Sequence, residues 1–469
     1  MQRMSGLDAS FYLLEDENTP LHVAAAIVLE GPAPGYGDLV RLVAAKLPAV
    51  ERYRQRVRSV PLHLGRPVWV DDPHFQILYH VRHTAVPAPG TMDQLRNLAG
   101  RIIAQRLDPQ KPLWELWLVE GLEGGRWALI GKVHHCMVDG VAGMDLIASM
   151  FDLDPDAPRP APPAEEWTPS RGPSGLRLLG EALVDNALQP LRMAGALPRL
   201  ALSLADAPRL AGYAGGVARQ VSRFTRRSAS VLNGPIGPHR RWPWASVPLD
   251  DAQKIRKRYG GTVNDVVLAA VTRGFRGQLA GRGALTSDMV VRSGVPVSVR
   301  TEEEKGALNN RVSAIFVNLP VGVADPLERY LLIRDQTEDL KASGQEVVGA
   351  KITRATDAAV APALLALGAR IPVRMFNPVV QTITTNVPGP NFPLYVLGRR
   401  IEDLFPYVPL TGGIQVGTAV FSYNGRLSFG VSADFDGQPD IEVFAEGIRA
   451  GFDELLHTRR RPRPVRAGK

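Results

Sequence analysis

The stretch of residues 132–140 holds the residue types that could do acid–base chemistry. Two neighbouring imidazoles, His134 and His135, are followed after three intervening residues by Asp139 and Gly140. An imidazole titrates near neutral pH, so it can take a proton from a hydroxyl group and later return it. Because neighbouring side chains of an extended chain point to opposite faces, only one of the two rings can face a given cleft.

The elements that must position this pair follow from the pattern of apolar residues. The run of residues 127–130 is apolar and strand-like, and apolar residues recur at helical spacing from residue 141 to 150. A strand, an Asp-Gly turn and a helix are therefore predicted in that order. Residues 114–121 are predicted to be the preceding strand. A turn at residues 122–125 joins the two strands into a hairpin, which carries the histidines to the edge of a first domain.

The pattern His-His-x-x-x-Asp-Gly resembles the signature of CoA-dependent acyltransferases of the chloramphenicol acetyltransferase type. That superfamily includes the condensation domains of peptide synthetases. The resemblance implies that the second histidine, His135, is the general base, and that His134 supports it. It also implies that Asp139, with Gly140 in the same turn, organises the loop by pairing with an arginine. We expect this arginine to be Arg54, although the basic residues around it also fit a solvated surface.

A longer set of motifs is similar to bacterial wax ester synthase/acyl-CoA:diacylglycerol acyltransferases. The matching segments follow in order over nearly the whole chain, at residues 7–11, 107–143, 232–237, 264–269, 296–300 and 386–390. The resemblance implies an α/β fold with mixed sheets, in which two chloramphenicol acetyltransferase-like lobes enclose a central channel and a helical crossover joins them. We expect the substrate-binding residues to be Pro112, Leu113, Trp114, Asn264, Asp265 and Asn386.

Asn264 has two interpretations. It stands at the head of a predicted helix, where an asparagine is a natural N-cap. Alternatively, it lines the cleft opposite His135 and donates a hydrogen bond to the substrate or to the developing oxyanion.

The composition of the middle of the chain predicts the domain organisation. Residues 154–173 are rich in proline and acidic residues, which is typical of a linker. We therefore predict an N-terminal lobe over residues 1–153, a linker and helical crossover over 154–235, and a C-terminal lobe over 236–469. Residues 175–227 are rich in Leu, Ala and Arg. They fit either a basic amphipathic surface on an anionic membrane or lipid droplet, or a crossover that packs on both lobes.

Composition and charge narrow the function classes. The chain has 469 residues, of which 45% are hydrophobic and 22% charged, as in ordinary globular proteins. The net charge of +8 favours anionic partners, namely nucleic acid, acidic lipid or a phosphorylated co-substrate such as acyl-CoA. No helix-turn-helix, zinc or RNP pattern occurs, so we expect no nucleic-acid partner. The single cysteine, Cys136, suits a reducing compartment. Without a signal peptide or a run of about 18 apolar residues, a cytoplasmic protein is predicted, peripherally associated with membrane or lipid droplets.

Other catalytic chemistries find no support in the sequence. There is no glycine-rich phosphate loop and no Gly-x-Ser-x-Gly element, and the histidines match no zinc-ligand spacing. Cys136 adjoins His135 in sequence, so its side chain diverges from the imidazole, which cannot readily activate it as a nucleophile. We expect no metal and no cofactor, with acyl-CoA as a co-substrate.

The predicted function is transfer of a long-chain acyl group from acyl-CoA to diacylglycerol or to a long-chain alcohol. This expectation comes from the family resemblance. Two alternatives remain open: a catalytically silent lipid-binding protein on the same scaffold, and a condensation-like enzyme that uses a carrier-protein thioester.

Overall fold

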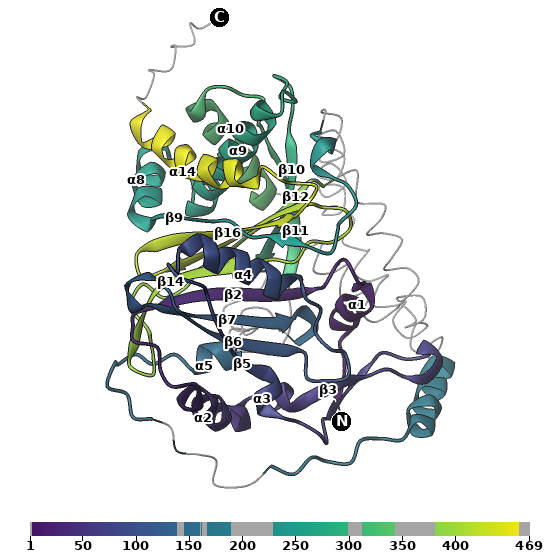
Figure 1. The fold of residues 1–469 in the computed structure, drawn as a ribbon. Coiled ribbons are helices and arrows are strands. Elements are labelled where there is room, and N and C mark those ends of the chain that lie inside the picture. Colours follow the sequence, from purple (N-terminus) through teal and green to yellow (C-terminus); the bar gives the residue numbers. More distant parts are fainter. Residues whose placement is uncertain are drawn as a thin grey trace, which may run out of the picture.

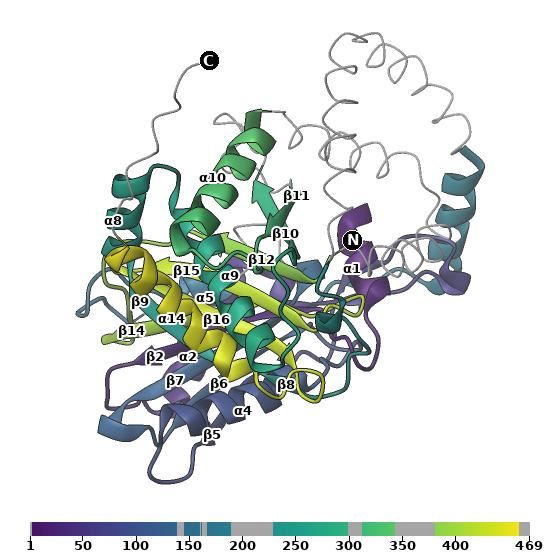
Figure 2. The same ribbon diagram turned by 90° about the horizontal axis from the view of Figure 1, so that it is seen from above.

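The computed structural model describes residues 2–137, 145–159, 161, 167–188, 228–298, 312–342 and 380–458. These residues form two lobes, each built on a mixed sheet with helices against it (Figure 1). Seen from above, the helices α8 (Leu249–Tyr259), α10 (Pro326–Ala342) and α14 (Ile441–His457) gather over the second lobe (Figure 2). The predicted α/β class with mixed sheets is confirmed.

The first sheet carries the histidines and has six strands in the order β13-β14-β2-β7-β6-β5. The strands are β13 (Tyr395–Val396), β14 (Arg399–Tyr407), β2 (His22–Leu29), β7 (Trp127–His134), β6 (Trp114–Glu120) and β5 (Val81–Ala85). Only β5 and β6 pair in parallel. The hairpin β6–β7 forms as predicted. Within the sheet, β7 lies between β2 and β6.

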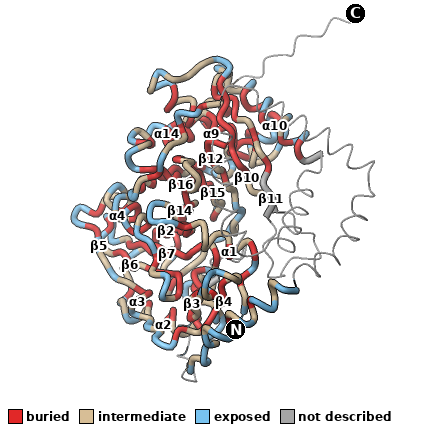
Figure 3. Tube along the Cα trace, turned by 90° about the vertical axis from the view of Figure 1, so that its right-hand side faces the viewer, coloured by how far each residue is buried: buried red, intermediate tan, exposed pale blue. Residues whose placement is uncertain are grey.

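Successive side chains of β2 and β7 point to opposite faces of the sheet, and both faces are buried. One face packs on α2 (Tyr36–Lys46) and α5 (Asp145–Ser149), and the other packs on α4 (Met92–Ala104). Helix α4 is amphipathic and begins with a capping box at Thr91, as its sequence favours. The buried residues run continuously through the sheets of both lobes (Figure 3).

The second sheet has the order β11-β10-β12-β15-β16-β8, with β9 also paired to β16. The strands are β8 (Arg240–Arg241), β9 (Trp244–Pro248), β10 (Val291–Ser298), β11 (Val312–Leu319), β12 (Thr382–Val387), β15 (Val416–Tyr423) and β16 (Arg426–Asp434). The long helix α9 (Val263–Gly281) and α14 bury their apolar faces against it. Asn424 and Gly425 have positive φ and form the hairpin turn between β15 and β16, as an Asn-Gly pair favours.

Strand β14 corrects the predicted domain boundaries. It belongs to the C-terminal half of the chain but pairs with β2 over residues 401–407. Trp242, Trp244 and Phe405 also pack against the face of the first sheet that carries α4. The first lobe is therefore completed by residues that the prediction assigned to the second, and it does not consist of residues 1–153 alone.

A small sheet and an additional helix lie beside the first lobe. The sheet has the order β1-β4-β3, with β1 at Gln2–Arg3, β4 at Val68–Asp71 and β3 at Gln55–Arg58. Strand β3 begins only at Gln55, because residues 51–54 form a 3-10 turn that buries Tyr53 and Arg54. The helix at residues 175–188 packs Leu178 and Ala182 against β4. The rest of the predicted 175–227 segment lies outside the described residues.

Candidate active site

The backbone of the two histidines is anchored to two neighbouring segments. His134 ends β7, and His135 begins the 3-10 turn η5 (His135–Met137). The amide of His134 donates to the carbonyl of Leu113 at 2.9 Å, and the amide of His135 donates to that of Leu21 at 2.8 Å. Because His135 already belongs to the 3-10 turn, strand alternation does not set the direction of its side chain, and the two rings pack beside neighbouring residues of α1 (Gly6–Leu14), His135 on Phe11 and His134 near Tyr12.

The ring of His134 is fully buried and faces polar groups. Its Nδ1 atom accepts a hydrogen bond from the amide of Cys136 at 3.1 Å. Its Nε2 atom lies 3.7 Å from Oε2 of Glu15. Burial lowers the pKa of His134 to about 3, and the neighbouring His135 and Arg106 add to the shift. This imidazole is therefore neutral over the physiological range.

The ring of His135 packs on Phe11 of helix α1 (Gly6–Leu14), with 4.0 Å between the ring centroids. Unlike His134, it keeps part of its surface exposed. Its Nδ1 atom is buried and has no hydrogen-bond partner in the described part of the chain. Burial lowers the pKa of His135, and its own backbone carbonyl partly opposes the shift. The resting imidazole is neutral, which is the state a general base requires.

A buried polar layer lies beneath the pair on the α4 face of the sheet. His22 is the cross-strand partner of His134, and its Nε2 atom bonds the carbonyl of Ile103 at 2.6 Å. Lys132 is wholly buried, and its Nζ atom lies 3.0 Å from the carboxylate of Glu115. The same Nζ donates to carbonyls at the end of α4, at 3.1 and 3.0 Å. The last turn of α4 is thus fixed to the strand that carries the histidines.

The loop residues Asp139 and Gly140 lie outside the described residues, so their pairing stays a prediction. Arg54, the expected partner of Asp139, is largely buried, and its guanidinium carbon lies 4.7 Å from the ring centroid of Trp167. Burial lowers the pKa of Arg54, with Glu51 and Asp71 opposing the shift.

The Pro112-Leu113-Trp114 element has a structural role that differs from the predicted one. Leu113 and Trp114 are each 1% exposed. The indole Nε1 of Trp114 donates to the carbonyl of Tyr53 at 2.8 Å, and its ring stacks on His80. Because both side chains are enclosed and Leu113 accepts the His134 amide, the element holds the histidine strand in place. The predicted contact of this element with substrate stays a prediction.

Asn264 and Asn386, from distant parts of the chain, are brought together. The side-chain amide of Asn386 donates to Oδ1 of Asn264 at 3.3 Å, and both residues are partly exposed. Helix α9 is capped by Thr262 and not by Asn264, so the N-cap interpretation is wrong by two residues. The Asn264 side chain is left for other contacts.

Asp265 is buried at the start of helix α9. It is 2% exposed, and it closes the capping box with Thr262. Its Oδ2 accepts from the amide and hydroxyl of Thr262 at 2.7 and 2.8 Å, and its Oδ1 accepts from the hydroxyl of Thr337 at 2.6 Å. Its Oδ2 thus serves the start of α9 and its Oδ1 joins that start to α10, so this carboxylate has a structural role, and its substrate contact stays a prediction.

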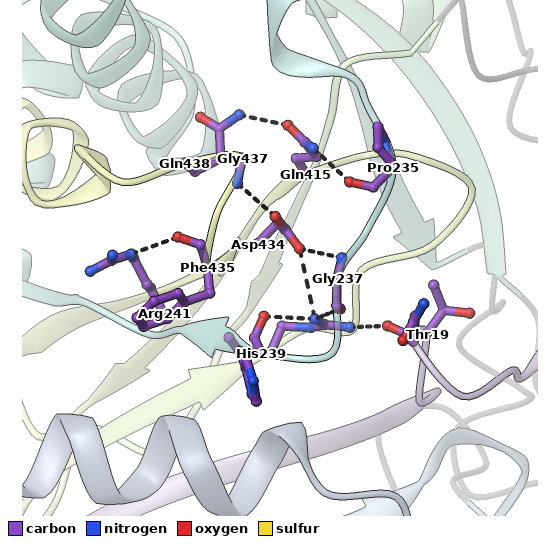
Figure 4. Close-up of polar contacts among 12 residues, drawn as sticks. Thr19, Pro235, Gly237, His239, Arg241, Gln415, Asp434, Phe435, Gly437 and Gln438 are labelled. Atoms are coloured by element: carbon purple, nitrogen blue, oxygen red, sulfur yellow. Dashed lines mark hydrogen bonds and ion pairs between the residues drawn. The ribbon is translucent and has the colours of Figure 1, made fainter.

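A cluster of polar contacts ties the first lobe to the second (Figure 4). The carboxylate of Asp434 accepts from the amides of Gly237 and Gly437, each at 2.7 Å. Arg240 is buried beside it, with Nη1 4.0 Å from the carboxylate, and its Nη2 donates to the carbonyl of Asn18. Asn18 lies in the loop between α1 and β2, whose last residues include the Leu21 carbonyl that holds His135.

Three residues around the site were missed from the sequence. Glu15 and Arg106 form an ion pair at 3.0 Å beside His134, and Phe11 packs on His135. Phe11 belongs to the motif at residues 7–11, which contributes to the family resemblance but predicts no role for this residue. Glu15 and Arg106 are 91 residues apart, and no local pattern joins them.

Within the described residues, no three His, Cys, Asp or Glu side chains gather closely enough to hold a metal ion. Among the same residues, no helix is long and apolar enough to span a membrane.

Solved structures define the class of protein. The chain aligns over 97% of its length with the wax ester synthase/diacylglycerol acyltransferase from Marinobacter aquaeolei VT8, at a TM-score of 0.68 and 25% identity, covering 98% of that chain. It shares its fold with the trichothecene 15-O-acetyltransferase of Fusarium sporotrichioides, at a TM-score of 0.61 and 13% identity over 97% of this chain and 94% of that one. The starter condensation domain of rhizomide synthetase also has this fold, at a TM-score of 0.56 and 12% identity over the same shares of the two chains. The two-lobed fold is therefore the one that the wax ester synthase/diacylglycerol acyltransferase shares with the acetyltransferase and the condensation domain.

The family follows from two sequence models and from curated relatives. The wax ester synthase/diacylglycerol acyltransferase catalytic domain matches residues 4–267, and the corresponding C-terminal domain matches residues 308–456. A probable diacylglycerol O-acyltransferase of Mycobacterium tuberculosis is 35% identical over 99% of this chain and 98% of its own length. The chain belongs to the wax ester synthase/diacylglycerol acyltransferase family, and the resemblance seen in its motifs is confirmed.

Proposed function

We propose that this protein transfers a long-chain acyl group from acyl-CoA to the hydroxyl of diacylglycerol or of a long-chain alcohol. Membership of the family and the names of its relatives support the acyl donor and the acceptor class. The observation that carries the proposal is the state of His135, a partly exposed residue with a neutral imidazole and a backbone amide anchored to Leu21. Asparagines 264 and 386 are proposed to contact the substrate from the second lobe across the predicted channel.

In this mechanism His135 removes the proton of the acceptor hydroxyl as the oxygen attacks the thioester carbonyl. A tetrahedral intermediate forms and collapses, the carbon–sulfur bond breaks, and the CoA thiolate takes the proton from the imidazolium. No acyl-enzyme is needed, because holding both substrates together supplies much of the rate advantage. The reaction also needs no cofactor beyond the co-substrate. Asp139, paired with Arg54, is proposed to hold the loop that follows His135.

The test is an assay with palmitoyl-CoA and a panel of acceptors that includes diacylglycerol and hexadecanol. Wild type is expected to form triacylglycerol or wax ester. His135→Ala is expected to lose about 10²–10⁴-fold in kcat, the usual contribution of a general base, and to keep its thermal stability. An unchanged rate in a folded His135→Ala protein would remove the assignment. Absence of any ester product in wild type would favour the silent lipid-binding protein. A donor preference for acyl-carrier protein over acyl-CoA would favour the condensation-like enzyme.

We also propose that the protein binds an anionic membrane or lipid-droplet surface peripherally through the helix at residues 175–188. The side of this helix opposite Leu178 and Ala182 exposes apolar side chains, with Leu176 at 83%, Leu183 at 54% and Val184 at 59%. Such exposed apolar groups favour burial in a lipid interface. Sedimentation with anionic vesicles should fall for a Leu176→Glu/Leu183→Glu variant. The control is Leu332→Glu, at an exposed leucine of α10. Equal binding by both variants would contradict the proposal.

A further inference from the structure

Glu15 is a buried carboxylate beside the histidine pair that the mechanism above does not use. It follows the last residue of α1, and its side chain is 4% exposed. The Nε and Nη2 atoms of Arg106 both lie 3.0 Å from its Oε2, which is the same oxygen that faces Nε2 of His134 at 3.7 Å. Among the residues that the structure describes, its Oε1 and the Nε2 of His134 are buried without a hydrogen-bond partner. Burying such groups costs free energy, so their placement together calls for a reason.

The hydrogen bonding of His134 fixes its tautomer. Its Nδ1 accepts the amide hydrogen of Cys136, so that nitrogen cannot carry a proton. In a neutral ring the proton must then sit on Nε2, which is the atom that points at Glu15. A carboxylate in that place favours the Nε2–H tautomer and disfavours the alternative, in which an unprotonated Nε2 would face the negative charge.

The same bond controls the turn that carries His135. The amide of His135 is held by Leu21 and the next amide, that of Cys136, by the ring of His134. If His134 adopted the other tautomer, its Nδ1–H would face the Cys136 N–H, and the two donors would repel. The turn η5 would then lose its second anchor, and the His135 ring would lose its direction.

We propose that Glu15, held by Arg106, is a positioning residue for His135. Its carboxylate keeps His134 in the tautomer that accepts the Cys136 amide, and this fixes the turn that aims the His135 ring. The proposal rests on the proposed function, in which His135 is the base. The simpler role for Glu15 is a structural ion pair that joins the end of α1 to the segment after α4, and the experiment separates the two.

Two matched pairs of variants test this chain of contacts. Asparagine places an acceptor oxygen near the Nδ1 position of histidine, whereas glutamine reaches the Nε2 position. His134→Asn should therefore keep at least fivefold more kcat than His134→Gln. Glu15→Gln retains an acceptor for the Nε2–H group and Glu15→Leu does not, so Glu15→Leu should lose about tenfold in kcat relative to Glu15→Gln, with KM for palmitoyl-CoA within about twofold. Equal kcat within both pairs would overturn the proposal.

A spectroscopic measurement makes the test independent of turnover. Selective ¹⁵N labelling of the nine histidines reports the tautomer of each ring, and the signal of His134 is the one that disappears in His134→Asn. Wild type should show His134 with an unprotonated Nδ1, and Glu15→Leu should shift it toward a mixture of tautomers. A protonated Nδ1 in wild type, or an unchanged tautomer in Glu15→Leu, would refute the role of Glu15. If wild type made no ester, the proposed function would fail while these spectra still decided the tautomer. If Glu15→Leu failed to fold, the comparison of His134→Asn with His134→Gln and the wild-type spectrum would still test the proposal.

Discussion

The guanidinium of Arg240 donates a hydrogen bond to the backbone carbonyl of Asn18, and so joins the start of the second lobe to the α1–β2 loop of the first. The same side chain donates to the carbonyls of Gly237 and His239. Because Leu21 of that loop accepts the amide of His135, the lobe contact and the histidine turn share one short segment.

Replacing Arg240 should therefore affect both stability and turnover. In Arg240→Met three partly buried hydrogen bonds to backbone carbonyls are lost and Asp434 loses its nearby charge, which should lower the free energy of unfolding by about 3 kcal/mol. Urea denaturation and kcat measure the two effects. Arg241→Met is the control, because its donor reaches the single carbonyl of Phe435 at an exposed site and should cost less than about 1 kcal/mol. Equal losses in the two variants would contradict the role of Arg240.

Asn264 and Asp265 are neighbours with separate expected roles. Asp265→Ala removes the capping box and the contact of Asp265 with the Thr337 hydroxyl, which keeps only the carbonyl of Arg334 as acceptor, so it should lower the free energy of unfolding by about 2 kcal/mol. Asn264→Ala should change that free energy by less than about 1 kcal/mol while lowering kcat/KM for the acceptor. Thermal unfolding of both variants measures the stability effect, and steady-state kinetics measures the effect on kcat/KM. A reversed pattern would show that Asp265, and not Asn264, contacts substrate.

The pH dependence of kcat/KM should follow the burial of His135. Because burial lowers its pKa below the ordinary value of 6.5, the free enzyme holds the neutral base at neutral pH. The rate should be flat from about pH 7 to 8 and should fall as the pH drops through a midpoint under 6.5. An acid limb with its midpoint above 6.5 would show that another group controls the rate.

His80 should make the fold sensitive to acid. Burial lowers its pKa to about 4, and its Nδ1 bonds the carbonyl of Trp114 at 2.8 Å. The unfolded chain binds a proton more readily below pH 6.5, so the stability due to neutral His80 is complete above 6.5. It is lost progressively between 6.5 and about 4, by about 3 kcal/mol in total.

Urea denaturation from pH 7 to 4 measures this loss. His80→Asn should be less stable than wild type at pH 7 and should show a shallower decline, whereas replacement of the exposed His457 by Asn should leave the decline as in wild type. The low pKa values of His22 and His134 act in the same direction, and the raised pKa of Glu15 acts in the opposite one. An unchanged slope in His80→Asn would contradict the prediction.

The crossing of α9 and α14 depends on glycines. A Cβ atom at Gly447 would lie 2.7 Å from Cα of Gly274, so Gly447→Ala must push the helices apart. We expect it to lower the free energy of unfolding by about 1–3 kcal/mol. Gly281 ends α9 with no atom within 4 Å of its would-be Cβ, and Gly281→Ala should be neutral or stabilising by up to about 1 kcal/mol. Calorimetry measures the stability of both variants. If Gly281→Ala lost as much free energy of unfolding as Gly447→Ala, the packing argument would be contradicted.

Local patterns predicted those elements whose cause is local. The hairpin at Asn424-Gly425 forms because both residues accept the positive φ that its turn requires. Helix α14 keeps its amphipathic period from Ile441 to His457. Strand β14 was missed because its residues 399–407 include several charges and a proline, and its place in the first sheet comes from pairing with a strand more than 350 residues earlier.

The histidine pair was identified from its motif, but most of its surroundings were not. The ion pair of Glu15 and Arg106 depends on two segments that meet only in the folded chain. Asn264 was read as an N-cap because an asparagine suits that position. The backbone instead begins the helix two residues earlier, where Thr262 and Asp265 complete a reciprocal cap.

Strand β14 is translated long after β2 and β7, and this order affects how the first sheet folds during synthesis on the ribosome. Strand β2 is almost wholly buried and lies between β7 and β14, yet its β14 neighbour is translated last of the three. At about 5–20 residues per second, the nascent β2–β7 pair waits on the order of tens of seconds with an unpaired apolar edge. A fragment that stops before residue 399 would keep that edge permanently, and it should aggregate or recruit a chaperone.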